Sequence, residues 1–345
     1  MIDYWHLGVN SLVVTVEQSA DSKKNQQVYA GLKGSIARQR EVLSDMLKIP
    51  LQTVADMCAV VWPDRELLGQ ALMSGIDSLP YCQYLYALDT QAQQISDNAS
   101  RKGLLTKHFG RDRSDRPYIK HTVPTENFIL SGAYMSMKAY RPSVTAIQLV
   151  RKEGKVIGFI GADFDLRDLP LTRILYEEPA QWKQIKGDPS IRGNVFFQTR
   201  ASSRLDEQLD DVLVILEELI SVHGVFHTQI HFSSSRAIVW LLEDPFRYRL
   251  LDVNELMDPE ICFAYPIVPY PEKAIIKSKQ IKSILDSFRQ LRFGDESIYL
   301  RSGSVNIFNG LIGLNFSCDG SHYIPFSEFL DKDMSFWGIS SASSK

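Results

Sequence analysis

The chain has 345 residues, a net charge of −3 and an isoelectric point near 6.2, which give no sign of a nucleic-acid partner. With 44% hydrophobic and 23% charged residues, its composition is that of a globular protein with two domains or one large domain. Its four cysteines include no CxxC pair, which argues against a disulfide framework and favours free, mostly buried thiols in the cytoplasm.

The N-terminal segment, residues 1–24, lacks the features of a secretory signal. It has an acidic residue at position 3, no early Lys or Arg, and only the short apolar run SLVVTV. No apolar run of about 18 residues, the length that spans a bilayer, occurs in the sequence. We therefore predict a cytoplasmic protein that does not enter a membrane.

A long helix is predicted over residues 23–49, because apolar residues recur on one helical face. These residues are Leu32, Ile36, Leu43 and Leu47. Pro50 is expected to end or kink the helix, and a second helical run follows it. Residues 62–75 form a further predicted helix with Asp64 as its N-cap. The long apolar stripe is equally compatible with core packing and with a homodimer interface.

The apolar period then changes to two, which predicts strands. YCQYLYALD (81–89) and QQISD (93–97) are joined by a short turn, and NFILSGAYMS (127–136) is a further strand. The basic, irregular segment 100–123 between them is predicted to be a loop with at most one short helix.

The clearest hairpin joins SVTAIQLVR (143–151) to VIGFIGADFD (156–165), with Glu153-Gly154 as a two-residue turn. That register places Asp163 roughly opposite Val144. Asp163 and Asp165 share one face of the strand because side chains two apart point the same way. The two small residues before it, Gly161 and Ala162, are expected to leave room beside the Asp163 side chain.

The second half repeats the order of helix and then antiparallel strands. We predict a connector at 173–204, a second α+β domain at 205–335 for which a PAS-like fold is one alternative, and a loose tail at 336–345. Within the second domain, two amphipathic helices each precede three strands. The last three are SIYLRSG, VNIFNG and LIGLNFS.

Three histidines, His223, His227 and His231, recur at a spacing of four, which on a helix would suit a metal. The segment VFHTQIHF is typical of a strand, where His227 and His231 would stand about 13 Å apart and could not share one ion. The sequence therefore favours a solvated strand face, no metal and no cofactor. No phosphate loop, nucleophile elbow or HExxH pair occurs.

The first half instead carries residues suited to a small zwitterion or carboxylate. The segment RDRSDRPYIKH supplies arginines that can grip a carboxylate, and tyrosines supply apolar walls with hydroxyl tips. Asp163 is suited to an ammonium group. The full set is Arg111, Arg113, Arg116, Tyr118, Lys120, His121, Tyr134, Tyr140, Arg141 and Asp163.

Three segments carry a resemblance to a known family. In chain order they are YLYALDTQAQQISDN, FGRDRSDRPYIKHTV and FILSGAYMSMKAYRPSVTAIQLVRKEGKVIGFIGADFDLRDL. Together they resemble the Cache family of sensor domains, which are PAS-like and also called PDC domains. The resemblance covers about residues 25–170 and implies a ligand-sensing domain over 25–172 in which a long helix precedes an antiparallel sheet. The family binds amino acids and carboxylates and signals through partner modules.

By position, the resemblance implies that Arg116 and Tyr118 grip a ligand carboxylate with Tyr134 beside them. Asp163 matches the aspartate that holds an amino group, and His121 matches a basic residue of some carboxylate-binding members. Two features depart from the family. The chain has no flanking transmembrane helices or signalling module, and the amino-acid pattern RxWY is only partly present, as RPYI.

Three functions are weighed. The first is a non-enzymatic sensor that binds a small carboxylate or amino acid, dimerises through its N-terminal helix and meets a signalling partner. The second is a PAS-like interaction protein without a ligand, which a pocket filled by side chains beside Asp163 would favour. The third is an enzyme built around His227, His231 and Glu243 in the second half.

Overall fold

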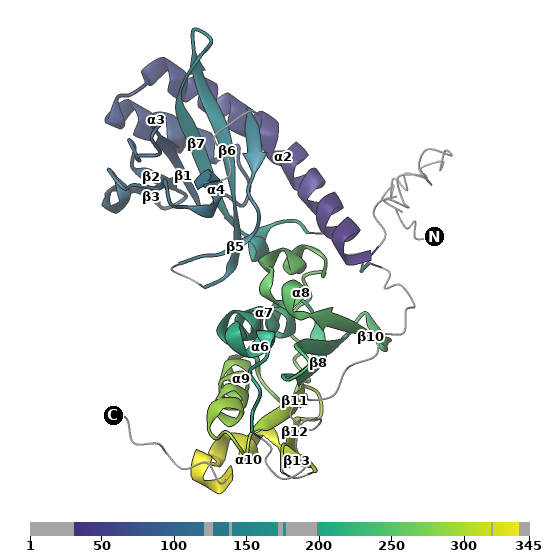
Figure 1. The fold of residues 1–345 in the computed structure, drawn as a ribbon. Coiled ribbons are helices and arrows are strands. Elements are labelled where there is room, and N and C mark those ends of the chain that lie inside the picture. The colour runs from purple at the N-terminus through teal and green to yellow at the C-terminus, as the bar shows by residue number, and fades with distance from the viewer. Residues whose placement is uncertain are drawn as a thin grey trace, which may run out of the picture.

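The computed structural model describes residues 31–120, 127–137, 140–171, 175–176, 199–318 and 320–337. Figure 1 shows an elongated molecule with one antiparallel sheet in its N-terminal unit (residues 31–171) and another in its C-terminal unit (residues 199–337). Every strand pairing within the two sheets is antiparallel, and helices flank both, so the predicted α+β class is confirmed.

The long helix α2 (Gly31–Val61) runs through Pro50, so of the two expected outcomes, an end or a kink, the end of the helix is ruled out. Leu47 and Leu51 lie on either side of the proline and are fully buried, so packing holds the helix together there. The expected helix α3 (Arg65–Ile76) follows, and its N-cap Asp64 accepts a hydrogen bond from the Leu67 amide at 2.9 Å. Residues 23–30 of the predicted helix lie outside the described residues.

The first sheet has the strand order β3-β2-β1-β7-β6-β4, and β5 also pairs with β6. Its strands are β1 (Tyr84–Leu88), β2 (Asn98–Ser100), β3 (Gly103–Leu105), β4 (Phe128–Leu130), β5 (Tyr134–Met135), β6 (Pro142–Lys152) and β7 (Lys155–Asp165). Short helices η1 (Thr106–His108), α4 (Pro117–Lys120) and η2 (Leu166–Asp168) lie between or after them.

Two predicted strands of this unit are only partly formed. QQISD makes isolated bridges at Gln93 and Gln94, because the Asp89 carboxylate accepts from the Gln93 amide and curls the chain before β2. The predicted strand 127–136 divides into β4 and β5.

The β6–β7 hairpin is confirmed, with Glu153 and Gly154 in its turn at positive φ angles of 52° and 77°. A β-bulge between Val150 and Arg151 shifts the register by one residue beyond the turn. Asp163 therefore lies opposite Thr145, and the predicted pairing with Val144 is wrong.

The first sheet buries its two faces against different partners. One face packs against α2 and α3 as part of the main core, through residues such as Val144, Ala162 and Phe164. The opposite face carries a separate small cluster under α4 and its flanking loop. Its buried members are Tyr86, Leu88, Tyr118, Ile147, Leu149 and Phe159. Asp163 lies on this second face, because it pairs across the ladder with Tyr84 and Thr145.

The C-terminal unit has a second sheet with the order β10-β9-β8-β11-β12-β13. Its strands are β8 (Val225–His231), β9 (Arg236–Leu241), β10 (Asp244–Asp252), β11 (Leu300–Asn306), β12 (Leu311–Phe316) and β13 (Ser321–Pro325). Its helices are α6 (Arg204–Glu207), α7 (Leu209–Val222), α8 (Val253–Met257), η3 (Pro259–Phe263), α9 (Ser278–Phe293), α10 (Phe326–Asp331) and η4 (Met334–Trp337).

This second sheet consists of two three-stranded meanders that meet at β8 and β11, preceded by α7 and α9 respectively. The two predicted strands SIYLRSG and VNIFNG form one strand, β11, and β13 was not predicted. A single hydrophobic cluster runs from Leu43 in α2 to Phe329 in α10, so the two units share one continuous core. Within the part of the chain that the structure describes, no helix is both long and apolar enough to cross a bilayer.

We predict that Gly161→Ala destabilises the protein by about 1–3 kcal/mol, because of overpacking. A Cβ at this position would lie 2.4 Å from the Tyr86 ring, which cannot retreat from its fully buried site. Urea unfolding measures the loss. Gly320→Ala is the control, since its Cβ would meet no atom within 4 Å and its φ lies outside the left-handed region that disfavours a side chain. An equal loss in both variants would contradict the packing argument.

Candidate ligand-binding site

Asp163 is the centre of a polar cluster on the outer face of the first sheet. Its Oδ1 accepts hydrogen bonds from the Tyr86 hydroxyl at 2.9 Å and from the Thr145 hydroxyl at 2.8 Å. Its Oδ2 has Arg113 as its only recorded partner among the described residues, at an N–O distance of 3.8 Å that is too long for a hydrogen bond. Although the carboxylate lies deep in the unit, 23% of its side-chain surface stays accessible. The site therefore leaves one acceptor oxygen under-used.

Arg113 is buried beside this carboxylate and is held by the chain on several sides. Its Nε donates to Gln94 Oε1 at 2.9 Å, and its Nη1 donates to the Tyr118 hydroxyl at 3.0 Å. The guanidinium carbon lies 3.7 Å from the centroid of the Tyr86 ring, a cation–π contact. Arg113 thus supplies a fixed positive charge that partly neutralises Asp163.

Tyr118 and Tyr134 form an aromatic wall of the same cluster. Their ring centroids are 5.7 Å apart, and the Tyr134 and Thr145 hydroxyls are hydrogen-bonded at 2.7 Å. Burial raises the pKa of the Tyr134 hydroxyl, and the nearby Asp163 charge raises it further. The Tyr134 phenol therefore stays protonated and can serve as a hydrogen-bond donor and acceptor at neutral pH.

The resemblance implies five ligand-binding residues, and the structure brings three of them together, namely Tyr118, Tyr134 and Asp163. Arg116 lies differently, because its Nη1 points to the sulfur of Met137 on the partly exposed side of the loop. His121 lies outside the described residues. Tyr140 is 70% exposed, and Arg141 approaches Asp165 at 3.7 Å, so neither contacts this cluster.

Sequence reasoning missed Tyr86, Thr145 and the central role of Arg113. The expected room beside Asp163 is filled by the Tyr86 ring, which packs over Gly161 and turns its hydroxyl to the carboxylate. Period-two alternation along β1 could have placed Tyr86 on this face. The expectation that Asp165 caps the following turn is confirmed, since its carboxylate accepts from the Arg167 amide at 3.0 Å.

Among the buried and partly buried groups at the site, positive charge exceeds negative charge, whereas Asp112 and Asp115 of the same loop are exposed. The pKa of the half-buried Arg111 is lowered by burial and then by the neighbouring Arg116 and Arg113 charges. Arg113 and Arg116 both also act on Asp163. Three guanidinium groups therefore accompany one buried carboxylate. This imbalance favours an anionic group as an additional partner.

The C-terminal unit does not gather its predicted candidates into a site. His227 and His231 lie in β8, and His227 Nδ1 is bonded to the Val305 carbonyl at 3.0 Å. No group of three potential metal ligands occurs among the residues that the structure describes. Between residues 199 and 318, no recorded hydrogen bond or ion pair joins Glu243 to either histidine.

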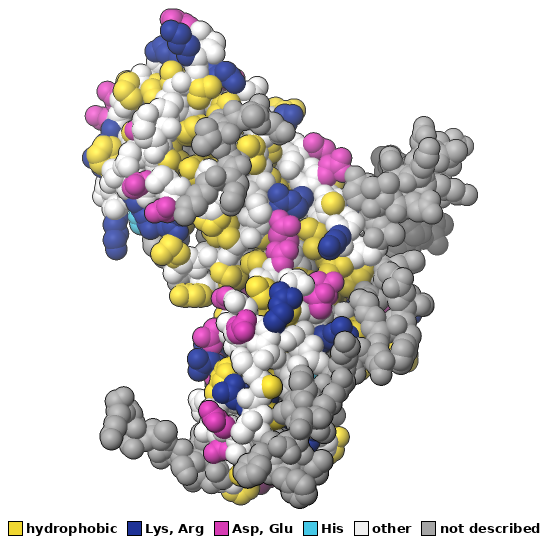
Figure 2. All heavy atoms as spheres, viewed as in Figure 1, with side chains coloured by type: hydrophobic (Ala, Val, Ile, Leu, Met, Phe, Trp, Pro, Cys, Tyr) yellow, Lys and Arg dark blue, Asp and Glu magenta, His cyan; other side chains and the backbone are white. Residues whose placement is uncertain are grey.

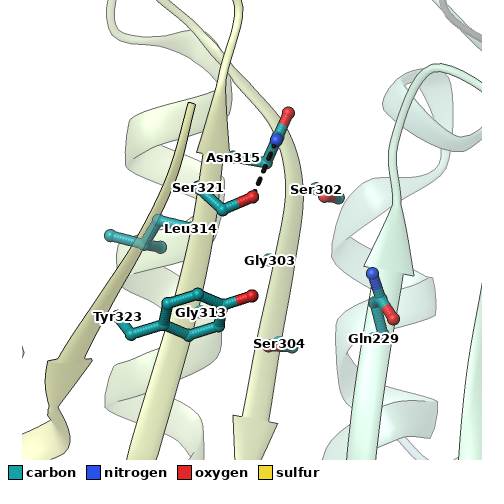
Figure 3. A pocket seen from close by; sticks show the side chains of 9 residues that line it. All are labelled: Gln229, Ser302, Gly303, Ser304, Gly313, Leu314, Asn315, Ser321 and Tyr323. Carbon is teal, nitrogen blue, oxygen red and sulfur yellow. Dashed lines mark hydrogen bonds between the residues drawn. The ribbon is translucent and has the colours of Figure 1, made fainter. Parts of the chain in front are cut away.

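Figure 3 shows a small notch on the uncovered face of the second sheet. Its volume is about 40 Å³, and its walls are mostly polar or glycine residues, among them Gln229, Ser304 and Asn315. A space of this size holds a water molecule or two and no metabolite. The notch gives no support to an enzyme in this half.

The prediction of free, mostly buried thiols is confirmed, since Cys58, Cys82 and Cys262 are buried and Cys318 is exposed. Burial raises the pKa of Cys58 and Cys82 to about 12, so these thiols are not nucleophiles at neutral pH.

On the face in Figure 2, acidic and basic side chains are interspersed without an extended field of one sign.

Comparison with protein-family models and with curated protein sequences finds no match. Among solved structures, the sensory domain of the Campylobacter jejuni chemoreceptor Tlp3 with isoleucine bound is 14% identical, with a TM-score of 0.33 over 42% of this chain and 60% of that one. The ligand-binding domain of the Pseudomonas fluorescens chemoreceptor CtaA with L-isoleucine is 17% identical, with a TM-score of 0.31 over 43% and 57%.

An extracellular ligand-binding receptor from Desulfohalobium retbaense also matches, at 14% identity and a TM-score of 0.32 over 39% of this chain and 25% of that one. The chain thus spans between a quarter and three fifths of the length of these structures. All three are receptors or sensory and ligand-binding domains of receptors.

We predict that Asp163 gives the protein a stability that falls as pH rises. Burial raises the pKa of this carboxyl above the ordinary 3.8, although Arg113, Thr145 and Tyr86 oppose the shift. The folded state therefore holds a proton that the unfolded state has released between pH 3.8 and the raised pKa, so stability declines across that window.

The test compares wild type with Asp163→Asn, which keeps an oxygen acceptor for the two hydroxyl donors. Denaturant unfolding between about pH 3 and pH 8 gives the difference in free energy of unfolding, in which the other carboxyls cancel. The difference should move in favour of the variant as pH rises. A difference that is flat, or that moves in favour of the wild type, would contradict the raised pKa.

Proposed function

We propose that the N-terminal unit is a Cache-type sensor domain that binds an amino-acid-like carboxylate against Asp163, and that the C-terminal unit is a separate α+β domain that responds to it. The observation that carries this proposal is the half-satisfied carboxylate. Asp163 is placed deep among aromatic residues, yet its Oδ2 receives no hydrogen bond from the described residues and remains accessible. Small-molecule sites commonly place a few such polar groups among apolar walls.

The ligand is assigned two charged ends. An ammonium group would donate to Asp163 Oδ2 and replace the weak 3.8 Å contact with Arg113. A carboxylate would meet the excess positive charge of Arg111, Arg113 and Arg116. Tyr118 and Tyr134 would flank the ligand body. A zwitterion of this kind leaves no buried charge without a partner.

The alternative without a ligand requires a side-chain network that satisfies itself. Part of the cluster does so, because Arg113 donates to Gln94 and Tyr118, and Asp163 Oδ1 accepts two hydroxyls. The remaining oxygen argues against a purely structural role, since a largely buried carboxylate is costly unless it is fully paired. The Tyr86 ring, which fills the space beside Asp163, favours this alternative, whereas the incompletely bonded carboxylate favours the ligand-binding function that we propose.

We predict that one or more members of a panel of L-amino acids and small carboxylates raise the melting temperature of the protein. A ligand that binds only the folded state stabilises it by about 2.7 kcal/mol at a hundred times its Kd. Asp163→Asn and Arg111→Gln should each abolish the rise, because one removes the partner of the ammonium and the other a partner of the carboxylate. Differential scanning fluorimetry measures the shift.

Asp168→Asn is the matched control, since this exposed aspartate follows the same strand but accepts only from Gln83. It should keep the full ligand-induced shift. The ligand-binding proposal fails if no compound in the panel shifts wild type. The assignment of the site fails if Asp163→Asn responds as wild type does.

We also propose that two copies associate through α2. An apolar stripe lies on its outer side, where Val42, Ile49 and Val60 are 53%, 76% and 78% exposed. At about 100° per residue, positions 42, 49 and 60 fall within some 20° of one another around the helix. Exposed β-branched residues in one straight line suit a matching helix of a second chain.

Ile49→Glu is therefore expected to shift the protein from dimer to monomer, because it places a charge at the centre of the stripe. Sedimentation velocity at micromolar concentrations measures the change. Lys48→Glu introduces the same side chain at an exposed position on another side of α2 and should leave the dimer intact. A monomeric wild-type protein would rule the proposal out.

A further inference from the structure

The C-terminal unit reaches the back of the ligand site through one glutamate. Glu260 of η3 forms an ion pair with Arg40 of α2, and its Oε1 also accepts from the Ala133 amide at 3.2 Å. Ala133 immediately precedes Tyr134, which forms part of the aromatic wall. A residue of the second unit therefore holds the backbone from which a ligand-site side chain projects.

Arg40 ties the same segment more tightly. It donates from Nη1 to the Ser131 carbonyl at 2.8 Å and from Nη2 to the Leu130 carbonyl at 2.9 Å. Ser131 in turn pairs with Thr145, donating its amide to the Thr145 carbonyl at 2.9 Å and accepting the Thr145 amide on its Oγ at 2.9 Å. The Thr145 hydroxyl donates to Asp163. The contacts from Glu260 to the site carboxylate are thus continuous.

A second ion pair joins η2, which directly follows β7, to the C-terminal unit. Arg167, four residues after Asp163, donates from Nε and Nη2 to the two carboxylate oxygens of Glu218 in α7, and Nε lies 2.7 Å from Oε1. The Glu218 side chain is only 4% exposed and that of Arg167 is 30% exposed, so the carboxylate of this pair is desolvated. The site is therefore bracketed by two ion pairs between the units, one reached through Thr145 and one along β7.

From this arrangement we propose that Glu260 is a positioning residue of the ligand site, and that through it the C-terminal unit reads whether the site is occupied. The inference rests on the proposed sensor function and names how the signal leaves the site. A ligand that draws Asp163 or Tyr134 toward itself pulls on Thr145 and Ala133, and hence on Glu260. Because coupling between two sites is reciprocal, a change at Glu260 must also be felt at Tyr134 and Thr145.

Amide hydrogen exchange tests this coupling on the full chain without any ligand. Glu260→Gln keeps an acceptor for the Ala133 amide and removes the charge that holds Arg40. It should speed exchange of the amides at 131–135 and 143–147 by at least about fivefold, while amides of β8, in the variant's own unit, change less than twofold. Glu272→Gln, at an exposed glutamate of the same unit, should alter neither segment.

The reverse direction uses Thr145→Val, which keeps the shape of the side chain and removes the hydroxyl that meets Asp163 and Tyr134. Exchange should rise at 258–264 around Glu260. If neither variant alters the other unit, or if exchange rises evenly along the chain, the coupling is refuted. This outcome is independent of the compound screen, so coupling without a ligand would overturn only the sensor function, and a ligand without coupling only the role of Glu260.

Discussion

A carboxylate placed in the interior of a sheet face dictates what surrounds it. Asp163 can remain there because two hydroxyls reach its Oδ1 and a buried guanidinium lies near its Oδ2. Each of these neighbours depends on a separate part of the fold. Tyr86 comes from β1, Thr145 from β6, and Arg113 from the loop before α4. Packing of three distant segments is thus directed by one charge, because a buried charge without partners would cost several kcal/mol.

The bulge in the β6–β7 hairpin makes this arrangement possible. Without the shift between Val150 and Arg151, an apolar valine would face Asp163 in place of Thr145. The hydroxyl of Thr145 is shared between Asp163 and Tyr134, while its backbone pairs with Ser131. One inserted residue therefore places Thr145 where it joins the Asp163 cluster to the segment that Glu260 and Arg40 contact.

Most helices and the central hairpin could be predicted from the sequence, because their signals are local. Asp64 is the N-cap that starts α3, and Glu153-Gly154 forms the turn of the hairpin. The failures come from contacts distant in sequence. Pro50 is tolerated because the core packs on both sides of it, and the bulge that moves Asp163 opposite Thr145 has no mark in the local pattern. Neither effect changes the hydrophobic periodicity of the local sequence, on which the predictions rest.

The candidate site shows the same division. Asp163, Tyr118 and Tyr134 were found because residue type and family position agree. The sequence favours Arg116, whereas the structure places Arg113, three residues earlier, beside Asp163. Which arginine turns inward depends on hydrogen bonds within the loop, such as that from the Arg116 amide to the Arg113 carbonyl at 3.0 Å. The exchange matters for the ligand. An inward Arg113 already balances Asp163, so a ligand with an ammonium alone would leave a net positive site. Under the proposed function a zwitterion or an anion would balance this charge, so charge more than shape defines the class of compound to test at the site.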